Sequence, residues 1–173
     1  MMFNKIDVIQ IITDHLETLT NNDTGNVRPI DLVLFFGIPV VVAVSLLAGL
    51  GSLEDQVLTI GATVFSILGG LLLNLLILVY ESLQHWSERK EPDAEVGKLL
   101  HHTFRNISFG VLTAVVALLF ILATAVSHGF VAKILSSFVY YLTCNFALTL
   151  LMVLKRVQSI ANIAGDSKSG KDV

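Results

Sequence analysis

Cysteine, proline and membrane-depth charge are scarce in this sequence. It has one cysteine and three prolines in 173 residues, and no charged residue lies in the middle of a long apolar run. Because Cys144 is the single cysteine, and it lies inside such a run, an intrachain disulfide is excluded and no oxidising compartment is implied. The chain also lacks a redox cysteine pair, a glycine-rich phosphate loop and a serine nucleophile elbow. We therefore expect neither an enzyme nor a cofactor-binding protein.

Long apolar runs are abundant instead. Hydrophobic residues make up 54% of the chain and the mean hydropathy is +0.76, far from the composition of a soluble domain. Each run has about 20 residues, which at about 1.5 Å per residue crosses a hydrocarbon core roughly 30 Å thick. The runs are continuous, whereas lipid-facing barrel strands alternate. The sequence therefore predicts an all-α integral membrane protein with four transmembrane helices, at about residues 32–50, 57–80, 107–127 and 134–154.

Basic residues are distributed unequally about these spans. Ten of the eleven flank the same ends of the helices, and only Lys133 lies at the opposite ends. Lys and Arg near helix ends are retained in the cytoplasm, so we expect a multi-pass protein of the cell inner membrane with both termini cytoplasmic. A proton-coupled antiporter and a voltage sensor are disfavoured, because both need charge at mid-depth and this chain has none there.

The expected domains follow the polar segments. Residues 1–28 are predicted to form a cytoplasmic amphipathic helix and linker, residues 29–164 the transmembrane domain, and residues 165–173 a disordered tail. Within the transmembrane domain, residues 81–106 are predicted to form a cytoplasmic helical hairpin that is interrupted around Pro92.

The predicted N-terminal helix has an apolar stripe and an acidic polar face. An acidic face does not suit an anionic inner leaflet, so this helix needs a protein partner. Two interpretations stay open, a packed structural helix and a moving gate. The candidate gating residues lie on the apolar stripe: Val8, Ile12, Leu16 and Leu19.

Small and polar side chains form stripes along the predicted spans. In the second span they recur at spacings of four, three, four and four, and fall within roughly 80° of one another. Such a stripe either packs helices together or lines a pathway for ions. More helix faces carry polar residues than the single interior of a four-helix bundle can bury. The remaining polar face favours contact with another subunit, and hence a homo-oligomer. The candidate pore-lining residues are Thr59, Thr63, Ser66, Gly70, Asn74, Thr113 and Asn145.

Histidines and basic residues gather at the expected cytoplasmic ends. Adjacent side chains on a helix point about 100° apart, so His101 and His102 do not chelate one ion easily, and we expect no metal site. The basic residues are explained either as interface anchors or as a binding site for a nucleotide or a single-stranded DNA oligomer. The candidate ligand-binding residues are Lys98, Arg105, Lys155 and Arg156.

Three segments carry a resemblance to known proteins. They are the acidic helix Val8–Leu19, the run Leu71-Leu72-Leu73-Asn74 and the run Leu151-Met152-Val153-Leu154-Lys155-Arg156. Together with the layout of the spans, they resemble the small multi-helix membrane effectors of bacterial anti-phage defence, and in particular the channel effector of the two-gene Hailong type. The resemblance implies an oligomeric channel that is kept shut by a short DNA oligomer made by a partner nucleotidyltransferase. Opening would then depolarise the infected cell.

Three functions of different classes remain open at this point. The first is a homo-oligomeric ion channel in membrane lipid, acting as a gated effector in antiviral defence. The alternative is a non-conducting membrane subunit or anchor whose hairpin recruits a soluble partner protein. A small-solute transporter is weaker, because the sequence shows neither a buried charge nor paired half-helices.

Overall fold

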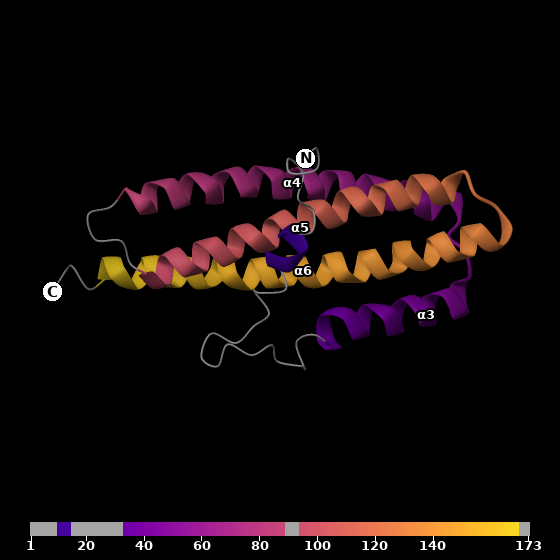
Figure 1. Ribbon diagram of the computed structural model, residues 1–173, viewed down its shortest axis with the longest axis horizontal. Helices are drawn as coiled ribbons and strands as arrows, with labels where there is room; N and C mark the ends of the chain where they lie inside the picture. Colours follow the sequence, from indigo (N-terminus) through magenta and orange to yellow (C-terminus); the bar gives the residue numbers. More distant parts are fainter. Residues whose placement is uncertain (1–9, 15–32, 89–93, 170–173) are drawn as a thin grey trace.

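The computed structural model describes residues 10–14, 33–88 and 94–169 (Figure 1). Every regular element within these ranges is a helix. Residues 10–14 form one helical turn, and the π-helical turn η1 spans Val33–Gly37. The four α-helices are α3 (Ile38–Leu50), α4 (Asp55–Ser87), α5 (Ala94–Ala125) and α6 (Gly129–Ser169).

The helices form an open layer rather than a closed bundle. The long helices α4, α5 and α6 lie side by side with α5 in the middle, and the shorter α3 packs on α6 (Figure 1). The order across the layer is therefore α4, α5, α6, α3. Among the described helices, α4 and α6 approach each other through side chains alone, as at the rings of Phe65 and Phe146, whose centroids are 5.1 Å apart. One edge of the layer is α4 and the other is α3.

Three helices are long and apolar enough to cross a membrane. They are α4, α5 and the Gly129–Asn162 part of α6. Three of the four predicted spans are thus confirmed as helices of membrane-crossing length, which indicates a membrane protein. The first predicted span contains only a shorter apolar helix, Phe35–Leu50, so the fourth crossing stays a prediction.

A seven-residue repeat of buried side chains holds the layer together. Repeats of this length bring one face of a helix back to its neighbour at every second turn, as in coiled coils. Lipid tails are as apolar as leucine, so helices in a membrane associate through close packing rather than through hydrophobic burial. The buried repeats are Leu58, Phe65, Leu72 and Val79 on α4, Leu100, Ile107, Ala114 and Ile121 on α5, and Val139, Phe146 and Val153 on α6.

Proline shapes the start of α3. Pro39 has no N–H to donate to the carbonyl of Phe35 four residues earlier, and the chain forms the π-helical turn η1 just before it. The side-chain amide of Asn145 on α6 donates to that carbonyl instead, with Nδ2 3.2 Å from the oxygen. A neighbouring helix thus satisfies the polar group that proline releases, as hydrocarbon surroundings require.

The two ends of the layer differ in their connections. At one end, the short-loop end, Gly51–Glu54 joins α3 to α4 and residues 126–128 join α5 to α6. There Leu53 donates its backbone N–H to the hydroxyl of the buried Ser136, at 3.0 Å. At the other end, the basic end, α4 terminates, α5 begins and α6 carries Lys155 and Arg156.

Helix α6 is longer than the sequence led us to expect. Helix runs through Ser169, whereas disorder was predicted from Gly165 onward. Each added helical residue gains a backbone hydrogen bond at little further cost once the helix exists, so a long helix extends into a polar segment. Residues 170–173 of the predicted tail, and Pro92 in the predicted hairpin, lie outside the described residues.

Candidate functional site: the polar face of α4 and the basic end

The polar stripe of α4 lies on the surface of the chain. All five of its members are exposed: Thr59, Thr63, Ser66, Gly70 and Asn74. Counted at about 100° per residue, the centre of the stripe lies roughly 150° from the buried face of α4. It therefore points away from α5, along the free edge of the layer. A Cβ built on Gly70 meets no atom within 4 Å, so the surface there is open to close approach.

Two residues of this stripe satisfy their own polar groups and two do not. The Thr59 hydroxyl donates to the Asp55 carbonyl and the Thr63 hydroxyl to the Thr59 carbonyl, both at 2.9 Å. Within the described part of the chain, the side chains of Ser66 and Asn74 make no hydrogen bond. An amide exposed to hydrocarbon is costly, so Asn74 is the residue of this face that most needs a partner from outside the chain.

The polar stripe of α5, in contrast, is buried. Asn106, Gly110, Thr113, Ala117 and Thr124 are all buried between the neighbouring helices. A Cβ on Gly110 would lie 3.0 Å from Leu72 Cδ1 of α4 and 3.4 Å from Thr149 Cγ2 of α6, so glycine permits the close approach of three helices. This stripe packs the layer.

Two of the seven predicted pore-lining residues are thus inside the chain. Thr113 is 5% exposed and its hydroxyl donates to the Phe109 carbonyl at 2.9 Å. Asn145 is 3% exposed and is engaged with the carbonyl of Phe35. The other five members of the predicted set lie together on the outer face of α4.

At the basic end, three cationic side chains surround His102. Its pKa falls from 6.5 to about 4, chiefly because it is partly buried and then because Arg156, Arg105, Lys98 and His101 oppose a further positive charge. Its Nδ1 atom is buried and has no hydrogen-bond partner among the described residues. We call Lys98, Arg105 and Arg156 the basic cluster.

The members of the basic cluster come from two helices. Lys98 and Arg105 lie on α5, seven residues and hence two turns apart, while Arg156 comes from α6. The side chain of Arg156 is only partly exposed, and this burial lowers its pKa. The fourth predicted ligand-binding residue, Lys155, is exposed and does not contribute to the electrostatic environment of His102.

The short N-terminal turn, residues 10–14, contacts this end through an acid. Asp14 Oδ1 lies 3.8 Å from Arg105 Nη2, and both side chains are about one-third exposed, at 30% and 35%. Ile11 joins Asp14, Phe104 and other α5 side chains around a cavity of about 250 Å³. Of the predicted gating residues, Ile12 is exposed at 39%, while Val8, Leu16 and Leu19 lie outside the described residues.

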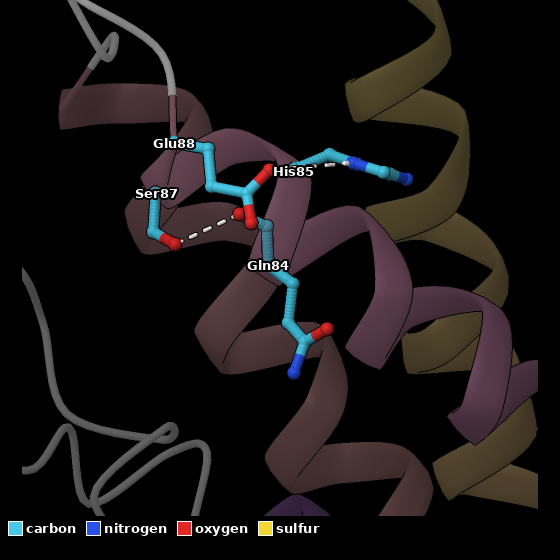
Figure 2. Close-up of polar contacts among 4 residues, drawn as sticks. All are labelled: Gln84, His85, Ser87 and Glu88. Atoms are coloured by element: carbon cyan, nitrogen blue, oxygen red, sulfur yellow. Dashed lines mark hydrogen bonds and ion pairs between the residues drawn. The ribbon is translucent and has the colours of Figure 1, made fainter.

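The end of α4 carries ordinary helix-terminal contacts and no metal site. Ser87 Oγ donates to the carbonyl of Gln84 at 2.8 Å, and His85 Nδ1 lies 3.9 Å from Glu88 Oε2 (Figure 2). Both His85 and Glu88 are largely exposed, so this pair is solvated. Nowhere in the described residues do three His, Cys, Asp or Glu side chains gather as a metal site would need.

Two further residues organise these surfaces, and no sequence pattern indicated them. Ser136 is fully buried and holds the short loop before α4. Gly97 lies under the ring of Trp86, and a Cβ at this position would overlap that ring. The pairing of Trp86 with a glycine of the next helix was not apparent, because the two lie on either side of the hairpin turn.

Comparison with protein-family models found no match for this chain. Searches of curated proteins and of solved structures also found none.

Proposed function

We propose that this chain is one subunit of a homo-oligomeric membrane pore, and that the polar stripe of α4 lines it. The observation that carries the proposal is the exposure of all five stripe residues on a helix of membrane-crossing length. A single chain in lipid would leave these groups against hydrocarbon. A second copy of the chain, or water enclosed by several copies, gives them polar surroundings.

The length of the stripe favours water over helix packing. From Thr59 to Asn74 it extends over 15 residues, about 22 Å at 1.5 Å per residue, which is most of the roughly 30 Å hydrocarbon core. Interhelical polar contacts in membranes contribute about 0.6 kcal/mol on average, so a packing face does not need a continuous polar line. A water-filled ion pathway, in contrast, is stabilised by polar groups along its wall.

The proposed orientation and gate follow from the charges. With the basic end in the cytoplasm, the chain crosses the bacterial inner membrane four times, η1 and α3 providing the first crossing. The basic cluster, with Lys155 beside it, then faces cytoplasmic anions, and a nucleotide or a DNA oligomer is the proposed ligand. Asp14 occupies Arg105 through a long ion pair, so an anionic ligand and the N-terminal segment would compete for the same cation. Such a pore suits an anti-phage effector that depolarises the membrane.

Conductance of the purified protein in planar bilayers tests the pore directly. Asn74→Leu and Thr63→Leu place apolar groups in the proposed lining and should lower single-channel conductance at least several-fold. Leu71→Ala is the matched control, since Leu71 is 58% exposed on the same helix but lies about 100° from the centre of the stripe. Undiminished conductance in both stripe variants would refute the assignment of the lining.

A different outcome would favour the alternative function. If neither the wild type nor any variant conducts, and a soluble protein co-purifies with the wild type only while residues 1–28 are present, the chain acts as a membrane anchor.

A further inference from the structure

A second feature of the layer is an apolar groove between α4 and α6. Its volume is about 470 Å³, within the range of small-molecule sites. Because α4 and α6 meet only through side chains, the space between their backbones is filled incompletely, and Ile121 of α5 forms its floor. Nearly the entire lining is apolar, and its two polar residues are Tyr140 and Thr143.

The groove opens sideways into the surroundings of the layer. Its rim on α4 includes Ile60 and Val64, which are 56% and 45% exposed, and its rim on α6 includes the exposed Thr143 and Ala147. The Thr143 hydroxyl donates to the Val139 carbonyl at 2.7 Å, so it needs no further partner. All four rim residues lie on helices of membrane-crossing length, where the medium outside the rim is hydrocarbon.

This opening is distinct from the polar stripe. On α4, Val64 lies about 120° around the helix from the centre of the stripe. On the same count Ile60, the other rim residue on α4, lies about 80° from that centre, so the stripe and the groove face different directions.

One cation lies in line with the groove. Lys133 is the sole basic residue between the ends of the predicted spans that face away from the cytoplasm, and the positive-inside rule does not account for it. It precedes the lining residue Tyr140 by seven residues, so it lies on the same face of α6, about 10 Å toward the short-loop end.

Nothing in the described chain neutralises this lysine. Lys133 is exposed, and it forms no ion pair with Glu54, Asp55 or any other residue in the described ranges. It also follows the N-terminus of α6, where the helix dipole favours anions rather than cations. The charge of the lysine therefore adds to the positive end of the α6 dipole.

We propose that the groove holds one acyl chain of a membrane phospholipid and that Lys133 binds the phosphate of the same molecule. Hydrocarbon is the medium at the rim, and an acyl chain complements a lining that is almost entirely apolar. The phosphate ester of that lipid lies at the membrane surface, where a lysine attracts it electrostatically.

Native mass spectrometry of the full-length protein in detergent, titrated with phosphatidylglycerol, tests this site. We expect one tightly retained lipid for each wild-type chain. Ala147→Trp fills the groove from its rim and should abolish that adduct, and the milder Thr143→Phe should weaken it. Leu78→Trp is the control, because Leu78 is 59% exposed on α4 about 20 Å along the helix from Val64. It should bind lipid as the wild type does.

The headgroup contact is tested separately with Lys133→Gln. Losing one lysine at a lipid surface should weaken phosphatidylglycerol binding about five-fold. Diacylglycerol, which has the same chains and no phosphate, should bind the wild type and Lys133→Gln equally.

Three outcomes would overturn the proposal. Unchanged lipid binding in both Ala147→Trp and Thr143→Phe would show that the groove is not the site. Unchanged phosphatidylglycerol binding in Lys133→Gln would show that Lys133 is not part of the lipid site. Dissociation of the oligomer by the two rim variants, with lipid adducts intact, would show that another chain occupies the groove.

Discussion

The role of a polar side chain in this protein depends on whether it is buried between helices or exposed on the surface of the layer. Asn145 and Asn74 are both amides on helices of membrane-crossing length, yet Asn145 is buried against a carbonyl and Asn74 is exposed with no partner in the described ranges. The difference separates a structural amide from a candidate functional one. Substitutions at the two positions should therefore affect different measurements.

Replacing Asn145 with Leu should destabilise the protein through the Phe35 carbonyl. A buried acceptor that loses its donor costs about 1–3 kcal/mol, so the free energy of unfolding in detergent should fall by that amount. Pro39→Ala restores a backbone N–H four residues after Phe35. The cost of Asn145→Leu should be smaller in that background, as a double-mutant cycle would measure. Equal costs in the two backgrounds would contradict this account of Asn145.

His102 should make stability depend on pH. Its pKa is about 4 in the folded chain and 6.5 when free, so between these values the unfolded state binds more protons. Acidification from pH 7 toward pH 4 should therefore destabilise the wild type. His102→Leu should unfold at a higher temperature at pH 5 and show a shallower decline with falling pH in a thermal unfolding series. His85→Leu, at an exposed position, should follow the wild-type curve.

At the scale of elements, the contact between α4 and α5 depends on a glycine beneath an indole ring. A Cβ at Gly97 would overlap Trp86, so Gly97→Ala should displace the ring and cost about 1–3 kcal/mol. Trp86 is the single tryptophan of the chain, and its fluorescence emission should shift to the red as it becomes more exposed. Gly49→Ala, where a Cβ meets nothing within 4 Å, should leave both the emission and the stability nearly unchanged.

The sequence predicts the helices better than their partners. Continuous apolar runs predict three helices of membrane-crossing length, whereas the buried repeat of Leu58, Phe65 and Leu72 was not predicted, because each is one apolar residue among many. The stripes of α4 and α5 have similar spacing, however, and nothing local distinguishes them. One is buried because α5 has neighbours on both sides, and the other is exposed because α4 forms an edge.

Individual site contacts were less predictable for the same reason. Asn145 meets a carbonyl 110 residues away, and that pairing depends on how α3 lies on α6. The basic cluster was predicted from its position at helix ends, but the inclusion of His102 depends on the register between α5 and α6. The pattern within one helix indicates which of its faces are apolar and which are polar. The contacts between helices depend on how the helices pack in the layer.

At the scale of the whole molecule, the proposed four-span topology makes a prediction about access. In a Cys144→Ser background, Ser52→Cys should react with a membrane-impermeant thiol reagent added outside intact cells. Ser87→Cys and Gln10→Cys should react only after the cells are opened, because both are expected in the cytoplasm. All three positions are exposed in the structure. Labelling of Gln10→Cys from outside would mean that η1 and α3 do not cross the membrane.

The open layer also has a geometric consequence for any ring of these chains. The stripe of α4 points along the layer and away from α5, so chains that share a central axis would extend outward from it like spokes, with α3 at the far rim. Adding one chain would enlarge the ring of α4 helices around the axis and would leave the packing within each chain unchanged. The calibre of the opening would then be set by stoichiometry, and the same fold would serve a narrow or a wide aperture.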